Sequence, residues 1–410
     1  MSDMKYGLIG KKLSHSFSKP IHEKIADYTY EIKELTNQEL DCFMRAKNFI
    51  GINVTIPYKE AVIPYLDSID EAAKAIGAVN TIINREGKLR GYNTDFYGMK
   101  LLIEKNGFDF SDAKVLILGS GGTAKTAFAV SEALGARDII TVSRNGSVNY
   151  ENVLSLHADA DFIINTTPCG MYPNNDTYAL DPCGFDKLKG IVDAVYNPLK
   201  TTLIQKGEEK GIKGVTGLYM LVAQAVVASE KFMGKNLDTL KIADEIYSCI
   251  LKEKQNLILI GMPGSGKSTV GKALAENLGR DFADTDDMIK ESHGDISEIF
   301  KNNGESFFRD IESEKVKEIS KKNSLVIATG GGAILRKENI DALRQNGVIF
   351  FLNRPLEDII PTSDRPLSSD VEALKKRFEE RYDIYKSTAD FEIEIDGSVE
   401  NAVEKIKRCL

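Results

Sequence analysis

Residues 257–274, LILIGMPGSGKSTVGKAL, constrain the fold more than any other stretch of this 410-residue chain. An apolar run leads into GMPGSGKS at 261–268, which matches G-x-x-x-x-G-K-[ST], and a helical pattern follows. In such a segment the glycines let backbone N–H groups turn toward phosphate oxygens, while Lys267 reaches the β- and γ-phosphates and Ser268 ligates Mg²⁺. The segment therefore predicts an α/β domain that binds ATP or GTP. The predicted nucleotide-binding residues are Gly264, Ser265, Gly266, Lys267, Ser268 and Thr269.

Length and charge restrict the class of protein. At about 100–200 residues per domain, 410 residues predict two to four domains. A net charge of −8 argues against nucleic-acid binding, because no face-wide excess of Lys and Arg is available to displace counterions. The first residues lack a basic stretch with a long apolar run, and no segment approaches the ~18 apolar residues of a membrane span. We expect a cytoplasmic protein without nucleic-acid or membrane partners, and the scattered cysteines predict free thiols.

Short apolar runs alternate with helical stretches along the chain, which predicts α/β architecture. Residues 123–135 predict a helix with Phe128 and Leu134 on one face and Gly135 as its stop. Residues 235–256 predict another helix, with apolar residues from Leu240 to Ile250 at three- and four-residue steps. We expect a domain boundary just after it, near residue 253. The predicted strands of the first half are 5–10, 49–56, 78–83, 114–119, 138–144, 160–167 and 190–195.

Candidate acceptor-binding residues follow the phosphate-binding loop. In FADTDDMIK, Asp284 and Asp286 alternate as they would at the end of a strand, where one carboxylate could serve a metal and the other a substrate hydroxyl. Plain surface acids are the alternative. Further on come GESFFRDIE with Arg309, SLVIATGGG with glycines at 330–332, DRPL with Arg365 and ERYDIY with Arg381. Taken together, residues 254–410 resemble shikimate kinase.

The resemblance implies a role for each of these residues. Asp284 holds the Mg²⁺ environment, and Asp286 positions and deprotonates the 3-hydroxyl of shikimate. Arg309 and Arg381 clamp the substrate carboxylate, for which a planar bidentate donor suits better than Lys. Arg365 matches the lid arginine that closes on the transferred phosphoryl group. Gly330, Gly331 and Gly332 let the backbone approach the ring closely. The segment 353–367 is shorter than the usual lid and has no arginine where one commonly stacks on adenine.

Polar residues near the start of the chain suggest a second pocket. Ser16 and Ser18 in SHSFSKPIH stand two apart after a short strand, so both hydroxyls could face one side and hold a small polyol or carboxylate. Serines in turns cap helices more often than they bind ligands. Strand ends and turns further on carry Asn53, Thr55, Lys59, Asn80, Asn93 and Asp95, which suit a polyhydroxylated ring. From spacing alone, a solvated surface lysine is the favoured interpretation of Lys59.

The segment KVLILGSGGTAKTA at 114–127 predicts a dinucleotide-binding turn between a strand and a helix. Gly119, Gly121 and Gly122 supply the turn, with Thr123 after them, and the last glycine position has drifted to Ala124. About twenty residues on, Ser143 and Arg144 stand where an Asp or Glu would bind a ribose 2′-hydroxyl. Arg144 favours NADP, because a guanidinium pairs with the 2′-phosphate. A surface arginine is the alternative.

Seven ordered motifs give residues 1 to about 250 a resemblance to shikimate dehydrogenase: NVTIPYK, GAVNT, NTD, GSGGTAKTA, NTTPCGM, YNPLKTTL and GLYMLVAQA. The resemblance implies that Lys59 and Asp95 are the catalytic pair beside the C3 carbonyl of 3-dehydroshikimate, with Lys59 protonating the alkoxide as NADPH delivers hydride. Gly217 lies near the nicotinamide. The implied substrate-site residues are Ser16, Ser18, Asn53, Thr55, Asn80, Tyr196 and Gln224.

Together the two resemblances predict a bifunctional enzyme that reduces 3-dehydroshikimate with NADPH and phosphorylates shikimate with Mg·ATP. We expect an α/β substrate-binding domain from 1–96 plus 217–252 and a Rossmann NADP domain from 97–216. From 253–410 we expect a P-loop kinase domain with an NMP-kinase-like α/β fold. Two alternatives stay open: a quinate dehydrogenase in the first half, and a kinase half that only senses nucleotide. The sequence sets no oligomeric state.

Overall fold

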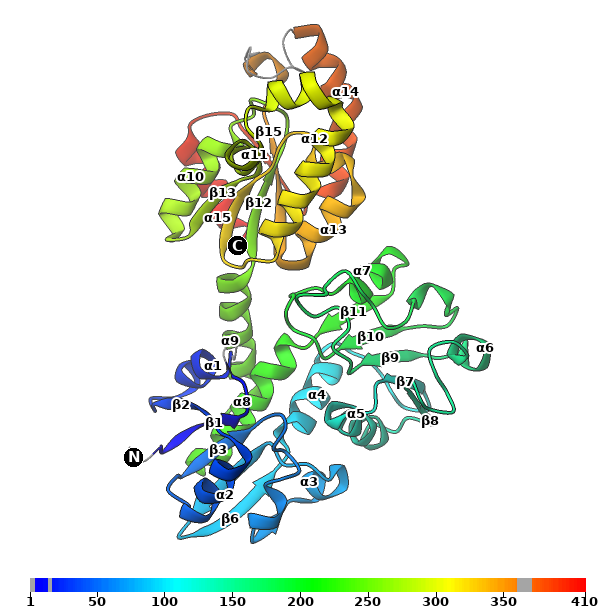
Figure 1. Cartoon of the computed structure of the whole chain (residues 1–410), viewed down its shortest axis with the longest axis vertical. Helices are drawn as coiled ribbons and strands as arrows, with labels where there is room; N and C mark the ends of the chain where they lie inside the picture. Colours follow the sequence, from blue (N-terminus) through cyan, green and yellow to red (C-terminus); the bar gives the residue numbers. More distant parts are fainter. Residues whose placement is uncertain (1–3, 14–16, 360–370) are drawn as a thin grey trace. The chain divides into compact units, whose positions relative to one another are not determined.

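The structure is a computed structural model that describes residues 4–13, 17–359 and 371–410. The chain folds as two compact units, Met1–Ile250 and Leu251–Leu410. Among the described residues each unit combines helices with largely parallel sheets, as predicted for the fold class (Figure 1).

The first sheet of the N-terminal unit has the strand order β2-β1-β3-β5-β6-β4. Strands β1, β2 and β3 run parallel, whereas β5 is antiparallel to both β3 and β6. The strands are β1 (Tyr6–Gly10), β2 (Tyr30–Glu34), β3 (Gly51–Val54), β4 (Ser68–Ile69), β5 (Thr81–Arg85) and β6 (Lys88–Tyr92). The helices among them are α1 (Ser18–Ile25), α2 (Asn37–Ala46), η1 (Ile63–Tyr65) and α3 (Glu71–Ile76).

The second sheet of this unit is parallel throughout, with the order β11-β10-β9-β7-β8. Its strands are β7 (Lys114–Leu118), β8 (Asp138–Val142), β9 (Phe162–Asn165), β10 (Gly190–Asp193) and β11 (Lys213–Thr216). The helices are α4 (Thr94–Lys105), α5 (Gly122–Ala133), α6 (Val153–His157), η2 (Pro182–Gly184), α7 (Thr202–Glu209) and α8 (Leu218–Met233). The chain reverses its winding direction at β7, between β8 and β9, and ligands of open α/β sheets bind beyond the strand ends at such a point.

The sheet of the C-terminal unit is also parallel, with the order β13-β14-β12-β15-β16. Its strands are β12 (Asn256–Ile260), β13 (Asp281–Asp284), β14 (Leu325–Ala328), β15 (Gly347–Asn353) and β16 (Phe391–Glu394). Its helices are α10 (Lys267–Leu278), α11 (Thr285–His293), α12 (Ile296–Ser320), η3 (Ala333–Leu335), α13 (Lys337–Asn346), η4 (Leu356–Asp358), α14 (Val371–Thr388) and α15 (Val399–Arg408).

Central strand β12 shows how this sheet is covered on both faces. Leu257 and Leu259 pack with residues of α10 and α15, while Ile258 and Ile260 pack with residues of α12, α13 and α14. Figure 1 shows these two groups of helices on opposite sides of β12. All four side chains are fully buried. Each contributes roughly 1.5–3 kcal/mol by leaving water. A continuous apolar run is therefore the expected sequence for a strand buried on both sides, and it holds the phosphate-binding loop at a rigid strand end.

Helix α9 (Thr239–Lys254) contains the boundary between the two compact units. Its last carbonyls are satisfied by residues further along the chain, since a helix leaves its final C=O groups without intrahelical partners. Arg280 donates to the carbonyls of Lys252 and Gln255, and Ser324 donates to those of Glu253 and Lys254. The C-terminal unit thus supplies the cap for this helix.

The structure confirms the predicted strands and the two predicted helices but corrects two of their faces. On α5 the buried face consists of Ala124, Thr126, Ala127, Val130 and Ser131, whereas Phe128 is 42% exposed. Leu240 at the start of α9 is 52% exposed. Small residues let α5 lie close to β7. Phe128, the largest apolar side chain of this helix, stays partly exposed.

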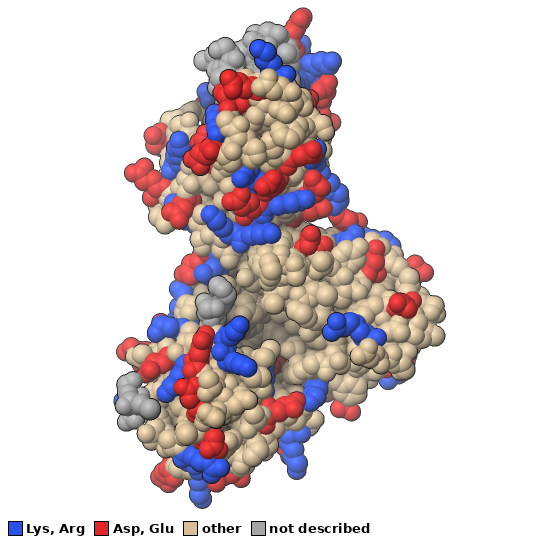
Figure 2. Space-filling view, in the orientation of Figure 1, with Lys and Arg blue, Asp and Glu red and all other residues tan. Residues whose placement is uncertain are grey.

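Figure 2 shows Lys and Arg intermixed with Asp and Glu on the visible face, with wide uncharged areas between them. The five cysteines all lie in the described parts of the chain, and none of them is in a disulfide, as predicted. Within the described ranges, none of the helices combines the length and apolarity that crossing a membrane requires.

Candidate active sites

A cavity of about 910 Å³ in the N-terminal unit brings together most residues predicted for the first active site. Segments after β3 and before β5 line it together with the chain after β10 and the start of α8. The predicted residues that line it are Ser18, Asn53, Thr55, Lys59, Asn80, Asp95, Thr123, Tyr196, Gly217 and Gln224. Ser16 lies outside the described residues.

Lys59 and Asp95 form an ion pair in this cavity, with Nζ 2.6 Å from Oδ2. Asp95 lies in the first turn of α4, where the helix dipole favours a carboxylate. The two side chains are 24% and 17% exposed, so both remain accessible from the cleft. The interpretation of Lys59 as a solvated surface lysine is therefore wrong, and an ammonium held by one carboxylate is a competent proton donor.

Buried amides form one wall of the cleft. Asn80 Oδ1 accepts a hydrogen bond from the Thr94 backbone N–H at 2.7 Å, and Thr94 Oγ1 lies 3.2 Å from Gln224 Oε1. Asn53 accepts from Tyr30 OH at 2.7 Å through Oδ1 and donates to the Asn80 carbonyl at 3.3 Å. Asn53 is thus largely engaged by the protein. Asn80 Nδ2 makes no hydrogen bond within the described parts of the chain, which leaves it for a ligand.

Ser18 is placed differently from the prediction. It is the first residue of helix α1, where successive residues turn by about 100°, so it does not stand in the extended segment that the prediction assumed. Tyr196 packs against Phe17 with ring centroids 5.5 Å apart, and burial raises the pKa of Tyr196, which keeps its hydroxyl neutral. Thr55 follows β3 and is half-buried. An aromatic hydroxyl and two aliphatic hydroxyls therefore reach the cleft from different elements.

The predicted dinucleotide-binding turn joins β7 to α5. Gly119 has φ +108°, a conformation that L side chains rarely adopt, and its N–H donates to the Val142 carbonyl at 2.8 Å. A Cβ on Gly121 or Gly122 would meet no atom within 4 Å. The space beside the helix N-terminus suits a pyrophosphate. Ala124, in place of a third glycine, is buried in α5.

Arg144 stands two residues beyond the end of β8, which pairs with β7. The Arg144 side chain is exposed, and Ser143 before it is half-buried. Because both strands are parallel, their carboxyl ends share one edge of the sheet. Arg144 therefore lies at the same edge of the sheet as the turn 119–122. A dinucleotide with its pyrophosphate at that turn would extend its adenosine 2′-phosphate toward this edge. Gly217, which caps α8, has no room for a side chain, since a Cβ would overlap the Ala194 carbonyl.

The phosphate-binding loop has the backbone that its glycines predict. Gly264 has φ +85° and Gly266, which precedes α10, has φ +96°. Lys267 is 9% exposed and donates to the carbonyls of Gly261 and Met262, each at 2.9 Å. These bonds hold the ammonium across the loop. The cavity beside it, about 450 Å³ in volume, also includes Ser268 and Thr269; Ser265 is fully buried within the loop.

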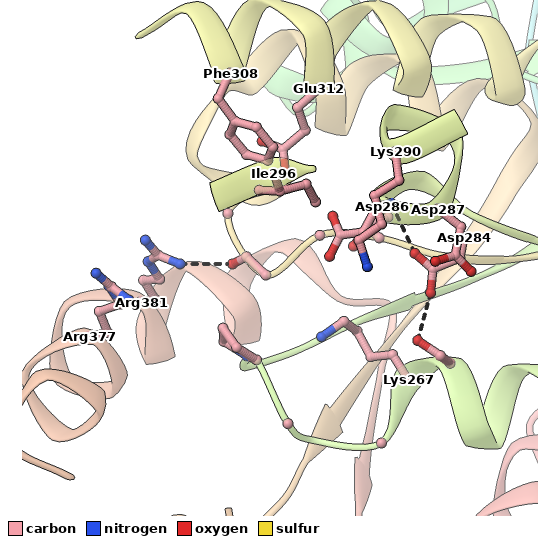
Figure 3. Close-up of a pocket in the computed structure, with 18 of the residues that line it drawn as sticks. Lys267, Asp284, Asp286, Asp287, Lys290, Ile296, Phe308, Glu312, Arg377 and Arg381 are labelled. Carbon is pink, nitrogen blue, oxygen red and sulfur yellow. Dashed lines mark hydrogen bonds between the residues drawn. The ribbon is translucent and has the colours of Figure 1, made fainter. Parts of the chain in front are cut away.

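Ser268 and Asp284 fit the predicted magnesium site. Ser268 Oγ donates to Asp284 Oδ2 at 2.6 Å, so a hydroxyl and a carboxylate oxygen converge beside the loop (Figure 3). Hard oxygen donors suit Mg²⁺, which takes one or two protein ligands and completes its shell with phosphate and water.

The position of Asp286 differs from the prediction that Asp284 and Asp286 alternate along one strand. Strand β13 ends at Asp284, whose side chain caps helix α11 by accepting from the Asp286 N–H at 2.9 Å. Asp286 therefore lies in the first helical turn. Figure 3 shows its carboxylate among the side chains that line the pocket. An N-cap Asp is the usual start of a helix, and this signal outweighs alternation over so short a strand.

Arg309 and Arg381 lie in the same pocket but are held differently. Arg309 donates to Glu312 at 2.6 Å and to Glu305 at 3.1 Å, while Arg381 donates to the Gly331 carbonyl at 3.1 Å. Burial raises the pKa of Glu312, and Arg309 draws that pKa back down. Burial alone would lower the pKa of Arg309, but these carboxylates raise it. Arg309 is thus a charged, oriented donor.

The three glycines at 330–332 make room for side chains of the site. A Cβ on Gly330 would lie 2.5 Å from Glu312 Oε1 and 2.6 Å from Asp286 Oδ1. A Cβ on Gly332 would overlap the Arg309 guanidinium. The glycines therefore let the pocket's charged groups approach the backbone, in addition to the substrate ring that the sequence suggested.

Several pocket residues were missed by the sequence analysis. Glu312 stands three residues after Arg309 and Arg377 four before Arg381, spacings that place each pair on one helix face. Figure 3 shows Arg377 and Arg381 side by side. Arg365 lies outside the described residues. The other unpredicted lining residues include Asp287, Lys290, Phe308 and Arg354 in this pocket and Lys11, Lys12, Met171 and Met220 in the first cleft.

The folds and sites define the class: a Rossmann-type NADP dehydrogenase followed by a P-loop kinase. Residues 8–82 match the shikimate dehydrogenase substrate binding domain model, and residues 263–410 match the shikimate kinase model. A Clostridium perfringens (strain SM101) shikimate dehydrogenase (NADP(+)) is 38% identical over 255 residues, covering 57% of this chain and 93% of that protein.

Solved structures agree over the same part of the chain. A chorismate mutase/shikimate 5-dehydrogenase fusion protein from Clostridium acetobutylicum gives a TM-score of 0.57 at 35% identity, covering 62% of this chain and 98% of that one. Shikimate 5-dehydrogenase from Thermus thermophilus, in complex with NADP(H) and shikimate, gives 0.53 at 25% identity, covering 60% and 99%.

The chain belongs to the shikimate dehydrogenase family and carries a shikimate kinase domain after it. It is a bifunctional enzyme of the shikimate pathway with both activities, and its cofactors are NADP(H), ATP and Mg²⁺.

Proposed function

We propose that Lys59 and Asp95 carry out the proton transfer in reduction of 3-dehydroshikimate. Bound NADPH would supply the hydride for the carbonyl carbon. As the C=O π bond breaks, the Lys59 ammonium gives its proton to the carbonyl oxygen. Asp95 holds the ammonium in place. The observation that carries this role is the 2.6 Å contact between Lys59 and Asp95. It lies in a cleft that is also lined by Thr123 and Gly217, two of the residues predicted to bind the cofactor.

The surrounding residues support binding of a hydroxylated ring. Asn80 has an amide free for a hydroxyl, and Thr55 and Ser18 supply further hydroxyls. Tyr196 lines the same cleft. Gly119, Gly121 and Gly122 would hold the pyrophosphate of NADPH, Arg144 would hold its 2′-phosphate, and Gly217 would lie at the nicotinamide end.

The test of this assignment is Lys59→Gln with Lys100→Gln as the matched control, since Lys100 is a surface residue of α4. We expect kcat for 3-dehydroshikimate reduction to fall ~10²–10⁴-fold, the usual contribution of a general acid, with KM for NADPH unchanged. An unchanged kcat would remove Lys59 from the reaction. Assays with quinate and with NAD test the substrate and cofactor alternatives.

We propose that the C-terminal unit phosphorylates shikimate with Asp286 positioning the 3-hydroxyl, and that Arg309 and Arg381 bind the carboxylate. The Asp286 carboxylate removes the hydroxyl proton as the oxygen attacks the γ-phosphorus and the bond to ADP breaks. Lys267 would offset charge on the β- and γ-phosphates, and Ser268 with Asp284 would hold the Mg²⁺, which would supply further positive charge to the phosphates. Asp286→Asn should lower kcat for shikimate-dependent ADP formation by ~10²-fold or more while ATP still binds.

We also propose the division into domains 1–96 plus 217–252, 97–216 and 253–410. The first sheet falls within the first range, the parallel sheet β7–β11 within the second and β12–β16 within the third. A cytoplasmic location, and the absence of nucleic-acid and membrane partners, stay predictions. A coupled assay with 3-dehydroshikimate, NADPH and Mg·ATP, followed for NADPH loss and ADP gain, tests both activities in one chain. NADPH loss without ADP gain would favour the nucleotide-sensing alternative.

A further inference from the structure

Arg354 occupies a defined place beside the phosphate-binding loop. It directly follows β15, and β15 runs parallel to β12 with Phe351 opposite Ile260. The chain segments that leave these two strands therefore emerge next to each other. A Cβ on Gly261, the first residue of the loop, would lie 2.8 Å from the Leu352 carbonyl oxygen. The register of the sheet thus fixes Arg354 near the loop.

The Arg354 guanidinium points at the start of helix α10. Its Nη1 lies 3.8 Å from the position of a Cβ on Gly266, the residue that caps that helix. Arg354 lines the same cavity as Lys267, Ser268 and Thr269. The backbone N–H groups and the helix dipole at this point favour an anion. A second cation here adds to that field.

One nitrogen of this guanidinium lacks a partner. Arg354 Nε is buried and has no hydrogen-bond acceptor among residues 4–13, 17–359 and 371–410. A guanidinium can only donate, so a group that satisfies it must bring acceptor oxygens. Residues 355–364, PLEDIIPTSD, contain no Lys or Arg, so Arg354 is the last basic residue before Arg365.

We propose that Arg354 is an additional phosphate-binding residue of the kinase site, which places its guanidinium against nucleotide phosphate oxygens held by the loop 261–268. The inference rests on the proposed kinase function and deepens it. Lys267 donates to two loop carbonyls, so part of its donor capacity is used within the loop itself. Arg354 supplies a planar, two-pronged donor from the neighbouring strand, for which phosphate is a matched acceptor.

The test is binding of Mg·ADP, Mg·GDP and Mg·pyrophosphate to the full chain by calorimetry without shikimate. In Arg354→Gln, we expect Kd to rise about tenfold to a hundredfold for all three, as when a charge-assisted contact is lost. Arg354→Lys should recover part of the affinity. Arg408→Gln, an exposed arginine of α15 outside this cavity, removes the same charge and should change none of them.

Three results would overturn the proposal. Weaker ADP binding with unchanged pyrophosphate binding would assign Arg354 to the base. Unchanged binding of all three ligands would remove it from the site. A fall in the thermal midpoint of the unliganded chain equal to that of the nucleotide-bound chain would make it structural. Failure of the proposed kinase function would be recognised by a separate assay, because the wild-type chain would then form no ADP when shikimate is supplied.

Discussion

The dehydrogenase cleft and the kinase pocket differ in how they hold charge. In the cleft one ion pair, Lys59 with Asp95, is accessible among mostly uncharged residues, with Lys11 and Lys12 exposed at its edge. The kinase pocket is dense in charge. Its charged lining residues are Lys267, Asp284, Asp286, Asp287, Lys290, Arg309, Glu312, Arg354, Arg377 and Arg381.

The difference follows from the two reactions. Ketone reduction needs one proton at one oxygen, whereas phosphoryl transfer brings several negative charges together and depends on fixed cations. Buried charges must be paired, and Glu312 with Arg309 is such a pair. Substitutions in the kinase pocket should therefore disturb structure as well as rate, and those in the cleft should act mainly on rate.

The largest expected effect comes from removing, one at a time, the two lysines proposed for catalysis. Lys59→Ala should lower dehydrogenase kcat ~10²–10⁴-fold and Lys267→Ala should lower kinase kcat at least ~10²-fold, because each removes a charge used in one reaction. The other activity of each variant should be unchanged in parallel steady-state assays. Loss of both activities in a folded single variant would break the comparison, since the sites would then be coupled.

Gly330→Ala tests how tightly the kinase pocket is packed. The new methyl would stand 2.5 Å from Glu312 Oε1 and 2.6 Å from Asp286 Oδ1, so a carboxylate must move. A displacement of about 1 Å at a reacting group can cost ~10²-fold, and we expect kcat for ADP formation to fall by that order. Gly397→Ala, whose nearest neighbour is a side-chain nitrogen at 3.3 Å, is the control. Equal activity of the two variants would contradict tight packing.

Buried carboxylates let the two halves be compared by the pH dependence of their unfolding free energy. Asp193, in the dehydrogenase half, accepts from Thr201 and Asn165, and burial raises its pKa to about 6. A raised pKa means that the folded state binds the proton more tightly, so this contribution to stability is full below pH ~4 and is lost as pH rises through about 6. Relative to Asp193→Asn, the wild type should lose about 2–3 kcal/mol of unfolding free energy between pH 4 and 7.

The control for this pH effect lies in the kinase half. Glu312 also has a pKa raised by burial, but Arg309 draws it down. Denaturant titrations across the same pH range should give Glu312→Gln a smaller pH-dependent difference from the wild type than Asp193→Asn. The reverse order would mean that the arginine does not stabilise the carboxylate.

Arg144→Ala should produce the smallest change. Because the Arg144 side chain is exposed, we expect KM for NADPH to rise roughly tenfold, from loss of a charge-assisted hydrogen bond to the 2′-phosphate, with NADH use nearly unchanged. Equal losses with both nicotinamides in initial-rate assays would defeat the NADP assignment to this residue.

Sequence predicted best the features that depend on local backbone. The glycines of both phosphate-binding turns were identified because a positive φ, as at Gly119 and Gly266, leaves a residue signature. Asp286 was assigned to the wrong element because the cap at Asp284 outweighs a short alternation.

Contacts across long separations had weaker signals. Lys59 and Asp95 are 36 residues apart, and spacing alone favoured a surface lysine; only the family resemblance paired them. No sequence motif marks Arg354. Its position beside the loop 261–268 depends on the register of β15 against β12, which the sequence around Arg354 does not show. Arg377 and Glu312 could have been found from helical spacing to arginines already recognised.

Helix α9 has a consequence for making the two enzymes separately. Its last turn is capped by Arg280 and Ser324, while Ala243 and Ile246 near its start are buried. If the chain were divided within residues 251–254, one of the two polypeptides would lack part of the last turn of α9. Genes for the separate halves should overlap, encoding 1–254 and 251–410, so that each polypeptide carries its own copy of the shared turn.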